Sequence, residues 1–137
     1  MRSKILVQGR YRVVGVMVGR RCPAEDFLAT GEAANDASRR GLMTILMHVA
    51  NNGLQGVPRN WTHEVNKQAG ICEFIKGDLR LYFFKGSNGD IAVCTTGLFK
   101  KQQKADKASI AQALEWRQSY ERAVRDGTYE VIKHVHQ

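Results

Sequence analysis

The sequence has few cysteines, few prolines and no long uncharged apolar run. Its 137 residues include three Cys and two Pro. An odd number of cysteines, each in or beside an apolar stretch, argues against a secreted disulfide framework and indicates a reducing cytosol. The start of the chain lacks an apolar stretch long enough for a signal peptide. The apolar part of residues 41–58 is shorter than the ~20 residues that span a bilayer. We therefore expect a cytoplasmic protein without a membrane segment.

The sequence also lacks a convincing metal motif. His134 and His136 have no third ligand nearby, and Cys72 and Cys94 fall on different expected strands, whereas structural zinc sites use closely paired ligands. We predict no metal and no cofactor. A position at a helix N-terminus would lower the pKa of the Cys22 thiol. No histidine is placed beside Cys22, however, and we interpret all three cysteines as small buried hydrophobes.

Positive charge is abundant and unevenly distributed. Lys and Arg number 21 against 13 Asp and Glu, a net charge of +8, while 43% of the residues are hydrophobic, as in one ordinary folded domain over residues 1–137. The excess lies in residues 1–41 and 67–107, each with eight basic and four acidic residues. A localised excess is typical of a protein that binds nucleic acid or an acidic protein. A basic protein without such a partner is the alternative.

The N-terminal half reads as a strand followed by two helices. Residues 11–18 are typical of a buried strand; residues 4–7 are a short partner strand or part of a basic lead-in over residues 1–10. Pro23, followed by two acidic residues, predicts the start of a short helix. Asp36 predicts the cap of a second helix that ends at residues 52–53. Its expected apolar stripe consists of Leu42, Ile45, Leu46, Val49 and Ala50.

The C-terminal half reads as a meander and a long helix. Strand patterns cover residues 71–76, 79–85 and 90–96, and the glycine-containing turns between them predict antiparallel pairing. Asp106 predicts the cap of a helix that Gly127 ends, and the tail over residues 128–137 is either an edge strand or disordered. The order strand, helix, helix, three-strand meander, helix predicts an α+β domain. We expect a small, mainly antiparallel sheet with one face free for a ligand.

Basic and aromatic residues gather around the meander. Strand alternation places Arg80 on the same face as Tyr82 and Phe84, opposite Leu81 and Phe83. The last strand is followed by three lysines, Lys100, Lys101 and Lys104. Such cations hold phosphates, and exposed rings stack on unpaired RNA bases. In the alternative interpretation, the lysines form a solvated loop and the rings belong to a second apolar layer.

Residues 67–121 resemble the RelE/ParE toxin superfamily, and specifically its phage-derived HigB-like branch. The resemblance rests on the stretches GICEF (70–74), LRLYFF (79–84) and GLFKKQQKAD (97–106). It implies a RelE-like single domain and the toxin of a type II toxin–antitoxin pair. Such a toxin is a metal-independent endoribonuclease that cuts mRNA on the ribosome. Its expected partner is a cognate helix-turn-helix antitoxin.

The resemblance also implies roles for individual residues. Arg80 would hold the scissile phosphate, and the lysine cluster would stabilise charge, with one member exchanging a proton because its neighbours repel its charge. Glu73 would be the general base or a salt-bridge partner that orients Arg80, and we favour the second role. Tyr120 is a further candidate RNA contact.

A non-catalytic function is the alternative. Members of this superfamily that act on gyrase do not cut RNA, and a decayed copy would keep its fold without its activity. Such a protein would bind an antitoxin or a gyrase-like target through its basic face. In either case, we expect the antitoxin to place acidic residues opposite Arg80 and residues 100–104.

Overall fold

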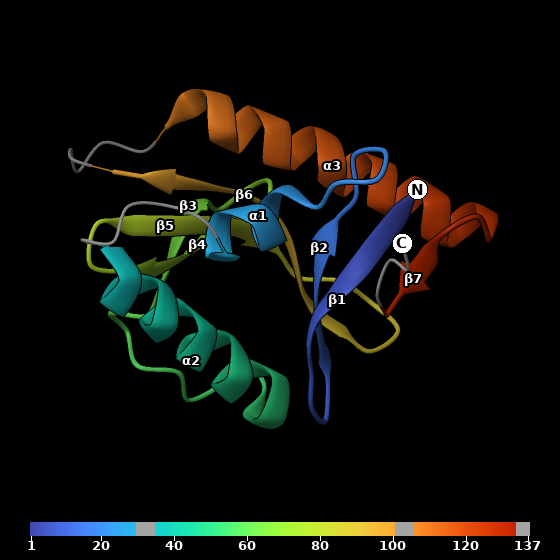
Figure 1. Ribbon diagram of the computed structural model, residues 1–137. Coiled ribbons are helices and arrows are strands. Elements are labelled where there is room, and N and C mark those ends of the chain that lie inside the picture. Colours follow the sequence, from blue (N-terminus) through green and yellow to red (C-terminus); the bar gives the residue numbers. More distant parts are fainter. Residues whose placement is uncertain (30–34, 101–105, 134–137) are drawn as a thin grey trace.

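The structure is a computed structural model that describes residues 1–29, 35–100 and 106–133. The described residues form seven strands and three helices (Figure 1). In chain order these are β1 (Arg2–Gln8), β2 (Arg12–Val16), α1 (Pro23–Ala29), α2 (Asp36–Asn52), β3 (Thr62–Asn66), β4 (Ile71–Lys76), β5 (Leu79–Phe84), β6 (Asp90–Phe99), α3 (Lys107–Asp126) and β7 (Glu130–Ile132).

All seven strands belong to one mixed sheet in the order β3-β4-β5-β6-β2-β1-β7. Four pairs of neighbouring strands are antiparallel: β3–β4, β4–β5, β5–β6 and β1–β2. The pairs β2–β6 and β1–β7 are parallel. The predicted fold, a RelE-like α+β domain on a small and mainly antiparallel sheet, is therefore wrong. The meander and the order of the helices are as expected, but the sheet is larger and mixed.

The sheet is larger than expected because three segments with weak strand signals extend it. Residues 1–10, expected to be a basic lead-in or to hold a short partner strand at residues 4–7, contain the whole of β1, which pairs along β2. The sequence of β3, THEVN, lacks an apolar alternation, yet its backbone pairs with β4 from Thr62 to Asn66. In the tail, β7 pairs with β1. Backbone pairing at the edges of a sheet places few demands on the side chains, so these strands leave little trace in the hydrophobic pattern.

Helices cover both faces of the sheet. Figure 1 shows α1 and α2 on one face and α3 across the other. The first face holds a core that includes Leu81 and Phe83, and the second holds one that includes Tyr82, Phe84 and Tyr120. The alternation predicted for β5 is therefore confirmed. The expected free face is not present among the described elements, because α3 packs on the strands that would have formed it.

The helix signals in the sequence are largely confirmed. All five residues of the predicted stripe of α2 are buried. The side chain of Asp106 caps α3 by accepting a hydrogen bond from the Ser109 N–H at 3.0 Å, and Gly127 ends the helix in the left-handed conformation with φ 73°. Asp36, expected to be a cap, is instead the first residue of α2 and forms an ion pair with Arg39.

Close packing of α1 on β6 depends on a glycine. A Cβ atom built at Gly97 would lie 2.1 Å from Cδ2 of Phe27, which is far inside contact distance. The Phe27 ring can therefore lie directly on the strand backbone. None of the helices in the described ranges is long and apolar enough to cross a membrane.

Candidate functional site

Three neighbouring strands place a histidine, a glutamate and an arginine on the face that α3 covers. His63 on β3 is the direct Cα partner of Glu73 on β4, and Glu73 in turn faces Tyr82 on β5. Arg80 lies two residues before Tyr82 and so shares its face, within diagonal reach of Glu73. We call His63, Glu73 and Arg80 the Glu73 cluster.

The carboxylate of Glu73 is buried but poorly paired. Its side chain is 3% exposed, and Oε1 lies 3.8 Å from Nε of Arg80 and 3.5 Å from Nδ1 of His63. These distances exceed those of strong charge-assisted hydrogen bonds. Its other oxygen, Oε2, is buried without a hydrogen-bond partner in the part of the chain that the structure describes. Burying a carboxylate with so few partners is costly, which is typical of a group kept for activity.

Arg80 is anchored at one end only. Its Nη1 donates hydrogen bonds to the carbonyl oxygens of Gly77, at 2.8 Å, and Leu79, at 3.0 Å. Nε faces Glu73 without a hydrogen bond, and no hydrogen bond of Nη2 is found within the described residues. The side chain is 18% exposed, so it is partly buried rather than free in solvent. An anchored guanidinium with a remaining N–H can donate a hydrogen bond to a phosphate oxygen.

The turn between β4 and β5 brings Lys100 close to Arg80. Gly77 accepts from Arg80, and the next residue, Asp78, accepts a 2.7 Å hydrogen bond from the backbone N–H of Lys100. Lys100 is 9% exposed, less than expected for a solvated loop. Lys101 and Lys104 lie outside the described residues. The backbone of Lys100 thus lies beside the turn that holds Arg80, and Arg80 faces Glu73.

The aromatic residues predicted to contact RNA are buried. Tyr82 and Phe84 are fully buried because α3 packs over them, and Tyr120, on α3 itself, packs into the same core and is 2% exposed. The expectation of exposed rings is wrong, since the second face is an apolar layer rather than a stacking platform. Burial raises the pKa of the Tyr82 hydroxyl, and the Glu73 charge raises it further.

Tyr120 belongs to a separate network around Asp90. The Asp90 side chain is fully buried. One of its oxygens accepts a hydrogen bond from Nε of Arg12 at 2.7 Å, and the other accepts from the hydroxyls of Tyr120, at 2.9 Å, and Tyr129, at 2.8 Å. Burial raises the pKa values of both tyrosines. This Asp90 network ties β2, β6, α3 and the segment before β7 together, so we assign Tyr120 a structural role.

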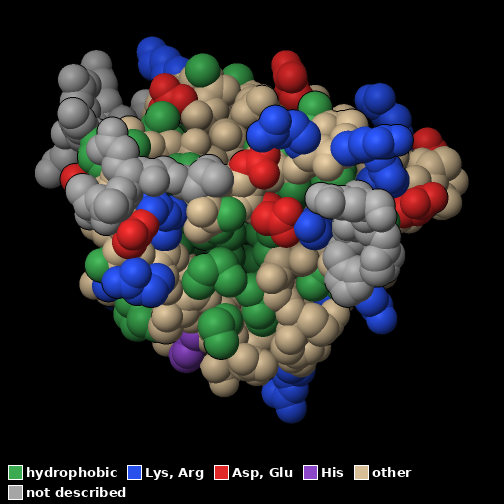
Figure 2. Space-filling view, viewed as in Figure 1, with side chains coloured by type: hydrophobic (Ala, Val, Ile, Leu, Met, Phe, Trp, Pro, Cys, Tyr) green, Lys and Arg blue, Asp and Glu red, His purple; other side chains and the backbone are tan. Residues whose placement is uncertain are grey.

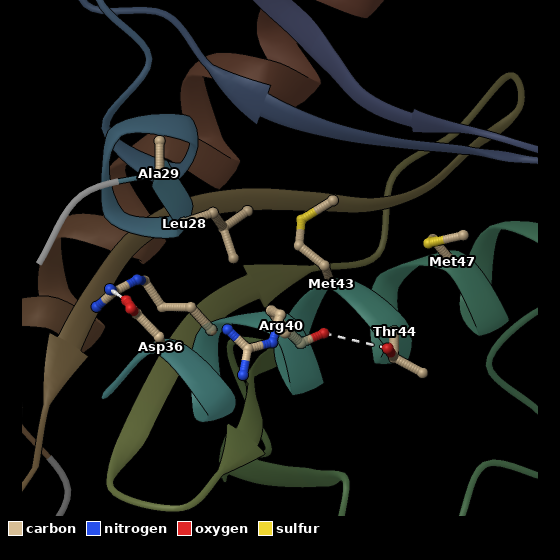
Figure 3. Close-up of a pocket in the computed structure, with 8 residues that line it drawn as sticks. Leu28, Ala29, Asp36, Arg40, Met43, Thr44 and Met47 are labelled. Carbon is tan, nitrogen blue, oxygen red and sulfur yellow. Dashed lines mark hydrogen bonds and ion pairs between the residues drawn. The ribbon is translucent and has the colours of Figure 1, made fainter. Parts of the chain in front are cut away.

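The opposite face carries a pocket between α1 and α2. The pocket has a volume of about 330 Å³ and is lined by Leu28, Met43 and Met47 with Arg40 at its margin (Figure 3). Met47 is 52% exposed. In the view of Figure 2, hydrophobic side chains gather in a hollow of this face, with both basic and acidic side chains around it. The pocket and the Glu73 cluster therefore lie on different faces of the sheet.

The cysteines offer no activated thiol. Cys22 directly precedes α1, but it is buried, and burial raises the pKa of its thiol rather than lowering it. Burial also raises the pKa values of Cys72 and Cys94. Within the described ranges, no group of three His, Cys, Asp or Glu side chains is arranged to hold a metal. His134 and His136 lie outside those ranges.

His63 and Asp90 are the site and network residues whose roles sequence reasoning missed. His63 lies on β3, the strand without a hydrophobic pattern, and only its pairing with Glu73 reveals it. Compared with known proteins, the chain matches no family model and no curated protein sequence. The resemblance to the RelE/ParE toxins therefore stays a prediction that rests on the motifs quoted above.

Proposed function

We propose that the protein is a metal-independent endoribonuclease that cuts mRNA on the ribosome, acting as a cytoplasmic toxin of a type II toxin–antitoxin pair. The observation that carries the proposal is that Arg80 faces Glu73 and is held by the same turn that binds the Lys100 backbone. The proposal rests on these residues and not on the family fold. The net charge of +8 favours a polyanionic substrate.

The arrangement suits the requirements of RNA cleavage by its own 2′-hydroxyl. The reaction needs a base for the 2′-hydroxyl, positive charge on the crowded phosphate and a proton for the departing 5′-oxygen. Arg80 would bind the phosphate through Nη2, while its Nη1 stays on the backbone carbonyls. Lys100 adds a second positive charge beside it. Glu73 would orient Arg80, since its Oε1 faces Nε of that residue.

Induction in a growing bacterium tests the proposal. We expect wild-type protein to stop growth and to produce new mRNA 5′ ends inside codons. Arg80→Ala should abolish both effects, because one positioned transition-state cation contributes about 10²- to 10³-fold in rate. The control is Arg122→Ala, which removes an exposed arginine of α3 and should leave toxicity intact. Absence of new 5′ ends with wild-type protein would overturn the proposal.

Binding of a protein target without cleavage is the second candidate function. The pocket beside α2 favours it, since exposed methionines adapt to partner surfaces and Met43 and Met47 line this pocket. In that case Met47→Glu should abolish growth arrest, while Arg80→Ala should preserve it. The endoribonuclease proposal predicts the reverse for Arg80→Ala.

The antitoxin partner follows from the same charge argument. An antitoxin that covers the Arg80 and Lys100 end of the sheet should present acidic residues there. Charges at the rim mainly speed association, so added salt should slow binding more than it speeds release. Association kinetics at two salt concentrations, with wild type and Arg80→Ala, test this arrangement. If the association rate changes neither with salt nor with Arg80→Ala, the antitoxin binds another surface.

A further inference from the structure

His63 is the accessible member of the Glu73 cluster. Its side chain is 65% exposed, whereas the side chains of Glu73 and Arg80 are 3% and 18% exposed. It lies on β3, an edge strand of the sheet, so an extended substrate can approach it from the side. Histidine is also the side chain best suited to exchange protons near neutral pH.

Glu73 cannot readily serve as the base itself. Its Oε1 faces Arg80 and His63, and its Oε2 is buried away from solvent. A 2′-hydroxyl must come within about 3 Å of the atom that takes its proton. Neither oxygen offers such access in this conformation. The carboxylate is instead placed to act on the imidazole ring, because Oε1 lies 3.5 Å from Nδ1 of His63.

We propose that His63 is the general base of the cleavage reaction and that Glu73 orients it; this inference rests on the proposed function. A proton on Nδ1 directed at Glu73 leaves the lone pair on Nε2 for the substrate. Nε2 takes the proton of the 2′-hydroxyl as the O2′–P bond forms. The P–O5′ bond breaks, and O5′ takes a proton from water. The products are a 2′,3′-cyclic phosphate and a 5′-hydroxyl, and His63 returns its proton to solvent.

The charges around His63 support a base that becomes positive during the reaction. Glu73 on β4 is the acidic group in contact with the ring and stabilises the imidazolium that forms. Arg80 on β5 faces the same Glu73 oxygen, Oε1, as His63 does. Its positive charge limits how strongly Glu73 stabilises the imidazolium. Glu64, the next residue of β3, alternates to the opposite face.

Cleavage of mRNA on purified ribosomes tests His63 directly. We expect His63→Ala to lower the cleavage rate about 10²- to 10⁴-fold, the usual contribution of a general base. Because the ring is exposed, the variant leaves room for a small base, and added imidazole should restore part of the rate.

The matched control is Glu64→Ala on the opposite face of the same strand, which should cut like wild type. Thermal unfolding of each variant shows whether it is folded. A His63→Ala protein that cuts as fast as wild type overturns the inference. So does a folded, slow variant that imidazole does not restore. If wild-type protein makes no cut, the proposed function fails, and that outcome is distinct from failure of the His63 variant alone.

Discussion

Glu73 and Asp90 are two acidic residues buried to the same extent, each 2% exposed, but their carboxylates are held differently. Asp90 has a guanidinium on one oxygen and two tyrosine hydroxyls on the other, all within 2.9 Å. Glu73 has two contacts of 3.5 and 3.8 Å on one oxygen and no hydrogen-bond partner on the other within the described residues.

The difference separates a structural carboxylate from a candidate functional one. A buried charge with a full set of hydrogen bonds holds its surroundings rigidly, and removing it leaves several groups unpaired. A buried charge with few bonds costs stability without providing such order, so its presence points to another purpose. The comparison therefore predicts opposite consequences when the two carboxylates are neutralised.

Neutralising Asp90 should have the largest effect on stability. Asp90→Asn replaces a charged acceptor by an amide that cannot accept from Arg12 and both tyrosines together. We expect the free energy of unfolding to fall by about 3–5 kcal/mol, as when a buried ion pair loses one partner. Urea denaturation measures the change. The exposed Glu115→Gln on α3 is the control and should stay within about 0.5 kcal/mol of wild type.

Removing one hydroxyl from the Asp90 network should have an intermediate effect that depends on pH. Tyr129→Phe loses a hydrogen bond to a charged acceptor, which contributes about 1.5–3 kcal/mol. The pKa of Tyr129 is raised in the folded protein, so above its ordinary value of 10.0 the unfolded chain loses the phenolic proton first. The wild type therefore loses this stabilisation as pH rises past 10. Urea denaturation at neutral and alkaline pH should show that the difference in free energy of unfolding between wild type and Tyr129→Phe becomes smaller as pH rises. A difference that stays constant would contradict this account.

Removing the hydroxyl beside the Glu73 cluster should have the smallest effect. The Tyr82 hydroxyl forms no hydrogen bond within the described ranges, although the backbone N–H of Asp106 lies close enough to favour its ionised form. Tyr82→Phe should change the free energy of unfolding by less than about 0.5 kcal/mol, because a buried hydroxyl without a strong partner adds little. Thermal unfolding measures the change. A loss as large as that of Tyr129→Phe would place both tyrosines in structural networks.

Sequence reasoning found the parts of the fold that have local signals. Local patterns predicted the α2 stripe, the Asp106 cap and the meander, because each of these features depends on residues close together in the chain. The parallel pairing of β2 with β6 joins Arg12 to Asp90, which are far apart in sequence. No local pattern specifies such a contact. The same reason explains why β3 was missed as a strand and why the sequence left the tail as either an edge strand, which β7 is, or disordered.

The candidate site was only partly predictable for a related reason. Alternation correctly placed Arg80, Tyr82 and Phe84 on one face. Glu73 lies beside Arg80, and the favoured role of Glu73 in orienting Arg80 stays a prediction. Alternation cannot show which face of a sheet a helix will cover. The rings were therefore expected to be exposed, whereas α3 buries them. His63 was missed because its role exists only through its pairing with Glu73.

Neutralising Glu73, with stability and cleavage measured on the same purified protein, tests the central claim most directly. Arg80 keeps its bonds to Gly77 and Leu79 without Glu73, so Glu73→Gln should leave the free energy of unfolding within about 1 kcal/mol of wild type. Cleavage of mRNA on ribosomes should fall about 10²-fold or more, since the amide neither orients Arg80 nor stabilises a charged His63. A variant that cuts like wild type but loses 3–5 kcal/mol, as expected of Asp90→Asn, would contradict the account.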